Sequence, residues 1–246
     1  MQWIVLAVMG ATVGAVMRRI NGLRAGGSLR EAGRLYRRAA WVLGLTVYGA
    51  MTVQEGVLLA SGMLTWQTGL PLHLCSMMGV ISLPMLLTGW PFLWHLSLYL
   101  GLPGAALALL FPAVLATPWP RATELSFFVM HAGLVLAPIL PLGLGRRPSP
   151  RGAASAGIFL LAMGAVVISV NDRLGSNYLF VNGAIPGTPL IWLDRWGMAG
   201  YRALLAALLV MLLAAEAATI QMILRRKEKT GDVKNSSCLR GRSMIK

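Results

Sequence analysis

Acidic residues are scarce in this chain. Asp and Glu contribute 8 of its 246 residues, against 22 Lys and Arg, and charged residues of both signs make up only 12%. Soluble domains carry about 25% charged residues, so this composition excludes an ordinary soluble domain. Long uncharged apolar stretches recur along the whole length instead, and hydrophobic residues reach 57%. These features predict an all-α, polytopic transmembrane helix bundle.

Cysteine is also scarce. Cys75 lies in an apolar stretch and Cys238 lies in the basic carboxyl-terminal segment. The topology described below places the two on opposite sides of a membrane, so we expect no disulfide between them. Neither has the spacing of a zinc or haem site. The sequence therefore predicts no metal and no cofactor.

Apolar stretches long enough to cross a membrane set the domain organisation. A helix rises about 1.5 Å per residue and the hydrocarbon core is about 30 Å thick, so a span needs about 20 residues. We predict about seven spans, with proline-induced kinks in the fourth and fifth. They cover residues 2–17, 41–63, 72–88, 94–115, 124–143, 153–170 and 199–224. The transmembrane domain is thus residues 1–224, followed by a basic, disordered tail over residues 225–246.

The basic residues predict the orientation of these spans. With seven spans, the basic stretches 18–38, 143–152 and 225–246 fall on one side. The other side receives only four basic residues, Arg121, Arg173, Arg195 and Arg202. The positive-inside rule then places the amino terminus outside and the tail in the cytoplasm. We expect anionic lipid headgroups, rather than nucleic acid, to be the partners of the basic loops and tail.

The basic stretch 18–38 has two possible structures. Ser28-Leu29-Arg30-Glu31 has the spacing of a capping box, and apolar residues recur after it at helical intervals. This pattern predicts an interfacial helix that leads into the second span. A solvated loop is the alternative.

Four polar side chains inside the predicted spans lie in the outer third of the membrane. His73 and Cys75 lie near the outer end of the third span, His131 lies in the fifth, and Glu55 lies in the second. Polar and ionisable residues in a membrane interior are costly, so each is a candidate for function. Structural roles are the alternatives: a cysteine can act as a small apolar filler, and a histidine or glutamate can bond a neighbouring helix.

The predicted outer loop between the last two spans adds further polar groups. Asn171, Asp172, Arg173, Asn177 and Tyr178 all fall in or next to it. Asp172 and Arg173 also fit a solvated interfacial pair, and Tyr178 also fits an aromatic belt. Substrate binding and plain interfacial roles both remain open for this loop.

These groups suggest a thiol chemistry. A thiol attacks as its thiolate, which a nearby imidazole stabilises. Cys75 lies past the first turn of the predicted helix 72–88, so the helix dipole adds little and a base is needed. His131 is the better candidate base, because His73 is only two residues from Cys75 and falls on nearly the opposite face. His73 would then bind a phosphate or carbonyl group, or pack against the outer loop.

The run Leu70-Pro71-Leu72-His73-Leu74-Cys75, the later His131 and the run Gly175-Ser176-Asn177-Tyr178-Leu179-Phe180 resemble the YwaF-like family of integral membrane proteins. The resemblance covers about residues 40–224. The family is similar to an animal transmembrane acyltransferase that acts on ether lysophospholipids, in which a cysteine and a downstream histidine are the proposed catalytic pair. These match Cys75 and His131. The resemblance implies a bacterial cytoplasmic membrane location, and it departs from many relatives at Ser76, where they carry Asp.

Two functions are compatible with these features. The first is a thiol-dependent phospholipid or lysophospholipid acyltransferase, or a related hydrolase. In it Cys75 would carry an acyl thioester and His131 would be the base, while His73, Asn177, Tyr178, Asp172 and Glu55 would bind substrate or orient an imidazole. The second is a non-enzymatic lipid-binding, transport or membrane-assembly protein with a polar intramembrane cavity. The sequence defines neither the substrate nor the oligomeric state.

Overall fold

A computed structural model describes residues 1–184 and 187–229, and every regular element within them is helical. The short elements η1 (Ser97–Gly101, a π-helix), η2 (Leu140–Leu144), η3 (Tyr178–Phe180) and η4 (Pro189–Trp196) interrupt or connect the α-helices. The α-helices are α1 (Gln2–Ala25), α2 (Leu29–Ala60), α3 (Leu74–Thr88), α4 (Pro91–Leu96), α5 (Leu102–Leu110), α6 (Pro120–Leu136), α7 (Pro150–Leu174) and α8 (Gly197–Lys229).

The all-α, polytopic prediction is confirmed. Six helical segments in the described residues are long and apolar enough to cross a membrane, and α3 is a shorter apolar helix of 15 residues. At 1.5 Å per residue α3 covers about 22 Å, which is less than the hydrocarbon thickness of about 30 Å. Helix α8 extends to Lys229, beyond the predicted boundary at residue 224. The rest of the predicted tail, including Cys238, lies outside the described residues.

The helix predicted to begin after Ser28 and to lead into the second span is confirmed, and the solvated-loop alternative is wrong. Most of the residues before Ser28 are helical as well. Helix α1 continues to Ala25 and α2 begins at Leu29, so most of the stretch is an extension of two spanning helices. Arginine is a good helix former, so basic residues do not end a helix. The chain reverses instead at Gly26–Ser28, where Gly27 has a φ of 80°.

Helices end or change type near the four prolines at which we predict kinks. Pro103 has no N–H to bond the preceding turn, and the π-helix η1 ends just before it, at Gly101. Pro112 lies beyond the end of α5. Pro138 and Pro141 lie where α6 has ended and the 3-10 helix η2 takes over. The predicted kinks at these four prolines are therefore helix ends and changes of helix type.

Helix α2 packs against α1, α3 and α6, and glycines set the contact distances. A Cβ atom added to Gly44 or Gly79 would lie 2.4 Å from Leu83 or 2.3 Å from Met51, respectively, at the α2–α3 contact. A Cβ atom at Gly133 would lie 2.4 Å from Cγ2 of Val47, where α6 meets α2. Small residues of this kind let membrane helices approach closely.

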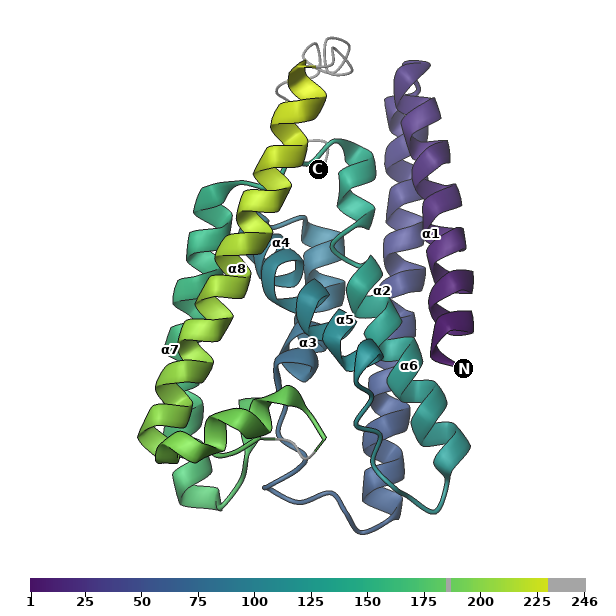
Figure 1. The fold of residues 1–246 in the computed structure, drawn as a ribbon. Coiled ribbons are helices and arrows are strands. Elements are labelled where there is room, and N and C mark those ends of the chain that lie inside the picture. The colour runs from purple at the N-terminus through teal and green to yellow at the C-terminus, as the bar shows by residue number, and fades with distance from the viewer. Residues whose placement is uncertain (185–186, 230–246) are drawn as a thin grey trace.

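The helices alternate in direction, as Figure 1 shows. The α1–α2 turn, the segment between η2 and α7, and the end of α8 lie together at the top of the view. We call this the basic end, because Arg24, Arg30 and Arg146 lie there. The connections 61–73 and 111–119 and the segments 175–184 and 187–196 lie at the bottom, which we call the opposite end. The directions of the helices and the end at which these arginines lie thus agree with the predicted order of seven passes.

The Gly133 contact generates a stability prediction. Gly133→Ala should lower the free energy of unfolding by about 1–3 kcal/mol, because a β-branched valine cannot move away from the new methyl group. Thermal unfolding in detergent measures the change. Gly49→Ala is the matched control, because its Cβ would meet nothing within 4 Å. Equal stability of the two variants would contradict this account of the α2–α6 contact.

Candidate functional site

The start of α3 differs from the prediction in a way that matters for Cys75. The helix begins at Leu74, with His73 as its N-cap residue, so Cys75 lies in the first turn. The first helical bond runs from the Met77 N–H to the His73 carbonyl. The N–H groups of Leu74, Cys75 and Ser76 therefore have no acceptor within the helix. The expectation that Cys75 lies past the first turn is wrong, and the positive end of the helix dipole lies at the thiol.

His73 packs against the connection that follows α7. Its ring centroid lies 5.0 Å from that of Tyr178, edge to face, and 5.0 Å from that of Phe180. Its Nδ1 atom is buried and makes no hydrogen bond in the described part of the chain. The imidazole therefore carries one buried polar atom that no group in the described residues satisfies.

Tyr178 joins two connections at the opposite end. Its side chain is fully buried, its hydroxyl donates to the Trp66 carbonyl (2.9 Å), and the same oxygen accepts the Leu70 N–H (2.9 Å). Burial raises the pKa of the Tyr178 phenol, so the hydroxyl keeps the proton that it donates. Tyr178 thus fixes the segment that leads into His73 and α3.

The loop that carries Tyr178 is held by Asn171. The side chain of Asn171 is fully buried, donates to the Tyr178 carbonyl and accepts both the Tyr178 N–H and the Ser176 hydroxyl. The following residues, Leu179 and Phe180, have φ values of 55° and 56°. Non-glycine residues adopt this left-handed conformation at an energetic cost, and such strain is found mainly at functional sites. The strained turn delivers the Phe180 ring to His73.

Asn177 and Asp172 make contacts within the same connection. The Asn177 side chain donates to the Gly183 carbonyl and accepts the Asn182 N–H. Asp172 is exposed and pairs with Arg202 of α8, with an N–O distance of 3.2 Å. Arg202, rather than Arg173, is therefore the ion-pair partner of Asp172. Both predicted binding residues have structural contacts here, and a role in substrate binding stays a prediction.

Glu55 lies near the depth of Cys75. Helices α2 and α3 are antiparallel, with Gly44 against Leu83 and Met51 against Gly79. Continuing this register places Glu55 level with Cys75 on the neighbouring helix. The Glu55 side chain is half-buried. On this register, Glu55 of α2 lies at the depth at which α3 begins, with His73 as the N-cap residue of α3.

His131 is buried in the middle of α6, with 4% of its surface exposed. Its Nδ1 is 2.7 Å from the Phe127 carbonyl, and its ring centroid is 4.1 Å from that of Phe127. Because a carbonyl only accepts, Nδ1 carries the proton in the neutral ring and Nε2 carries the lone pair. That tautomer is the one that a general base needs.

Cys75 and His131 approach α2 at different heights. Cys75 is half-buried against the main core and lies level with Glu55, whereas the Val47–Gly133 contact places His131 level with Gly49. The two differ by roughly six residues of α2, about 9 Å along the bundle axis. Within the described residues no hydrogen bond joins Sγ to either nitrogen of His131. Their catalytic pairing stays a prediction.

Comparison with known protein families gives one match. A sequence model of the TMEM164 family matches residues 1–215 of this chain. The chain belongs to the TMEM164 family. Searches among characterised proteins and among solved structures gave no match. Membership of this transmembrane family agrees with the spanning helices, and it identifies the chain as a multi-pass integral membrane protein.

Sequence reasoning missed three contributors to this site. They are Trp66 and Leu70, which act through backbone groups, and Phe180, which acts through its ring. None of these residue types indicates a functional role by itself. The run from Gly175 to Phe180 marked the loop but not its strained turn. In the part of the chain that the structure describes, no group of three or more His, Cys, Asp or Glu side chains could hold a metal ion.

The two hydrogen bonds of Tyr178 generate a prediction. Tyr178→Phe should lower the free energy of unfolding by about 1–2 kcal/mol, because it leaves the Leu70 N–H and the Trp66 carbonyl, in part-buried hydrogen bonds, without their partner. Limited proteolysis between residues 61 and 73 should also accelerate, as measured by mass spectrometry of the fragments. Tyr36→Phe removes a single bond to the Leu86 carbonyl at a distance from this loop, so it should leave that cleavage unchanged. Cleavage unaffected by Tyr178→Phe would refute the coupling of the two loops.

Proposed function

We propose that this TMEM164-family protein is a membrane-embedded, thiol-dependent acyltransferase that acts on phospholipid or lysophospholipid. The observation that carries the proposal is the position of Cys75 in the first turn of α3. There the helix dipole and the N–H groups of Leu74, Cys75 and Ser76 favour negative charge on the sulfur or on a nearby oxygen. Cys75 is only partly buried, so some of its surface remains accessible to a lipid ester.

The reaction has two balanced steps. Sγ of Cys75 attacks the ester carbonyl of a donor lipid, a thioester bond forms, and the carbon–oxygen ester bond breaks. His131 takes the thiol proton at Nε2 and gives it to the departing lysolipid oxygen. The hydroxyl of an acceptor lysolipid then attacks the thioester and loses its proton to His131, which returns it to the sulfur. Water in place of the acceptor would give a lipase. Both steps require His131 and Cys75 to come within reach when lipid is bound.

His73 is proposed to bind the ester carbonyl or the lipid headgroup. Its buried Nδ1 has no hydrogen-bond partner among residues 1–184 and 187–229, and the rings of Tyr178 and Phe180 hold the imidazole in place. A group that brings a donor or an acceptor to this nitrogen would satisfy it. Glu55, Asn177 and Asp172 would support this end of the site.

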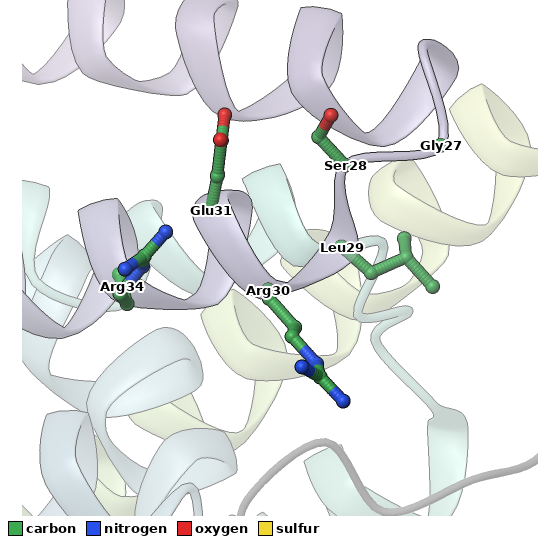
Figure 2. A pocket seen from close by; sticks show the side chains of 6 residues that line it. All are labelled: Gly27, Ser28, Leu29, Arg30, Glu31 and Arg34. Carbon is green, nitrogen blue, oxygen red and sulfur yellow. The ribbon is translucent and has the colours of Figure 1, made fainter.

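We also propose that the basic end faces the cytoplasm of a bacterial cell and contacts anionic headgroups there. An open pocket of about 560 Å³ lies at the α1–α2 turn and is lined by Gly27, Ser28, Leu29, Arg30, Glu31 and Arg34. Figure 2 shows that Arg30 and Glu31 point in different directions from α2. Guanidinium groups at a membrane surface attract phosphate, at about 1 kcal/mol per basic residue.

The acyl-thioester proposal is tested with the full chain in detergent and a phospholipid that carries an isotopically labelled acyl chain. Mass spectrometry should find the labelled acyl group on the Cys75 peptide. Cys75→Ala should abolish acyl transfer, and His131→Gln should slow it by a factor of about 10² or more, because a general base contributes 10²- to 10⁴-fold. Cys238→Ser is the matched thiol control and should react like the wild-type chain.

Retained transfer in Cys75→Ala would refute the proposal. The non-enzymatic alternative would be favoured by another result: Cys75→Ala leaves lipid binding or transport unchanged, whereas variants of His73, His131 or Glu55 lose it.

His73→Phe separates ring packing from binding. This variant keeps an aromatic ring between Tyr178 and Phe180, so the melting temperature should change little. The KM for the lipid should nevertheless rise several-fold, because the buried nitrogen is lost; a hydrogen bond of this kind contributes about 1 kcal/mol. An unchanged KM would assign His73 a packing role alone.

A further inference from the structure

A second group of reactive side chains lies at the basic end, around the first turn of α7. Ser149 is the N-cap residue of this helix, and its Oγ accepts the Gly152 N–H at 3.0 Å. Nε2 of His95 lies 3.4 Å from the same Oγ. The acyltransferase proposal uses neither residue. They form a hydroxyl–imidazole pair contributed by two different helices.

The position of His95 depends on a glycine and a tyrosine. A Cβ atom at Gly152 would lie 2.2–2.4 Å from three atoms of the imidazole, so the ring rests directly on the backbone of α7. On its other side the ring stacks on Tyr99, with 6.1 Å between centroids. The Tyr99 hydroxyl donates to the Ser149 carbonyl at 3.2 Å. The same contacts therefore hold both members of the pair.

The orientation of the ring suits general-base chemistry. Nε2 is the ring nitrogen that faces the Ser149 hydroxyl. In the neutral tautomer with its proton on Nδ1, Nε2 carries the lone pair. The Ser149 hydroxyl can donate to that lone pair while its oxygen accepts from Gly152. Ser149 and His95 thus supply a nucleophile and a base, and the packing of the ring on Gly152 and Tyr99 orients the base.

We propose that Ser149 and His95 are a second nucleophile–base pair, which attacks the ester of a lipid with an anionic headgroup at the basic end. Oγ bonds to the ester carbonyl carbon, Nε2 takes the hydroxyl proton, and the carbon–oxygen ester bond breaks as that proton passes to the leaving oxygen. The Arg151 N–H has no helical acceptor, because the first helical bond is donated by Ala153 to Ser149, and it can bind the developing oxyanion.

The headgroup preference comes from Arg146. Its guanidinium lies over the Trp94 ring, 5.4 Å from the centroid, and that ring is 5.1 Å from the His95 ring. Arg151, in the first turn of α7, adds a second positive charge. Positive charge next to the pair favours a substrate that carries phosphate. This pair lies at the other end of the bundle from Cys75, so it is independent of the proposed thioester site.

The test uses the full chain in mixed micelles with a long-chain alkyl fluorophosphonate. Attack by Oγ forms an oxygen–phosphorus bond, releases fluoride and transfers the hydroxyl proton to His95. Mass spectrometry should find the phosphonate on the Ser149 peptide. His95→Gln, which keeps a polar side chain but not a base, should slow labelling at least tenfold. Cys75→Ala should leave it unchanged, which separates this proposal from the proposed function.

Two variants control for folding and for chance reactivity. Ser149→Asn removes the hydroxyl and keeps a side chain that can cap α7, so it should lose labelling while circular dichroism and gel-filtration behaviour stay unchanged. Ser155→Ala removes a hydroxyl from the same helix that bonds the Gly152 carbonyl instead of a histidine, so the rate at Ser149 should not change. Absence of an adduct at Ser149, an equal rate in His95→Gln, or equal labelling of Ser155 would overturn the proposal.

Discussion

The opposite end of the bundle depends on the hydroxyl of Tyr178. Backbone N–H and carbonyl groups that leave regular structure need other hydrogen-bond partners, and the irregular segment before α3 finds two of them in a side chain from elsewhere in the protein. Tyr178 supplies one donor and one acceptor to that segment, at Trp66 and Leu70. Asn171 in turn holds Tyr178 through two hydrogen bonds and accepts a third from Ser176. The place where α3 starts, and with it the environment of Cys75, follows from this chain of contacts.

The helix content and the order of the passes could be predicted because they depend on composition. Apolar length identified each span, and the clustering of arginines set the direction of each. Helix boundaries were less predictable, since the arginines between residues 18 and 38 continue their helices and only the turn at Gly26–Ser28 reverses the chain. The start of α3 also shifted, because Pro71, Leu72 and His73 stay non-helical under the tertiary contacts of the connection after α7.

Only part of the candidate site could be predicted, because the sequence shows residue types and span positions but not tertiary contacts. His73, Cys75, Glu55 and Tyr178 stand out by residue type, and the spans gave each a depth. Their contacts depend on a turn in which Leu179 and Phe180 adopt positive φ, and no residue preference announces such a turn. The side chains of Asn177 and Asp172 also satisfy neighbours within the loop, which polarity alone does not reveal. The pair formed by His95 and Ser149 was not predicted. The ring fits there because Gly152 has no side chain, and a glycine in the sequence gives no sign of such a contact.

The shortness of α3 has a consequence for the surrounding bilayer. A helix of 15 residues spans about 22 Å, about 8 Å less than the hydrocarbon core. The mismatch falls at the amino-terminal side of α3, where a polar, irregular segment takes the place of helix. Lipids beside this segment must thin or tilt to match it, at a cost of a fraction of a kcal/mol per Å. Under the proposed function, such a local dip would bring headgroups and ester linkages toward the depth of Cys75 and shorten the distance that a lipid has to move out of its leaflet.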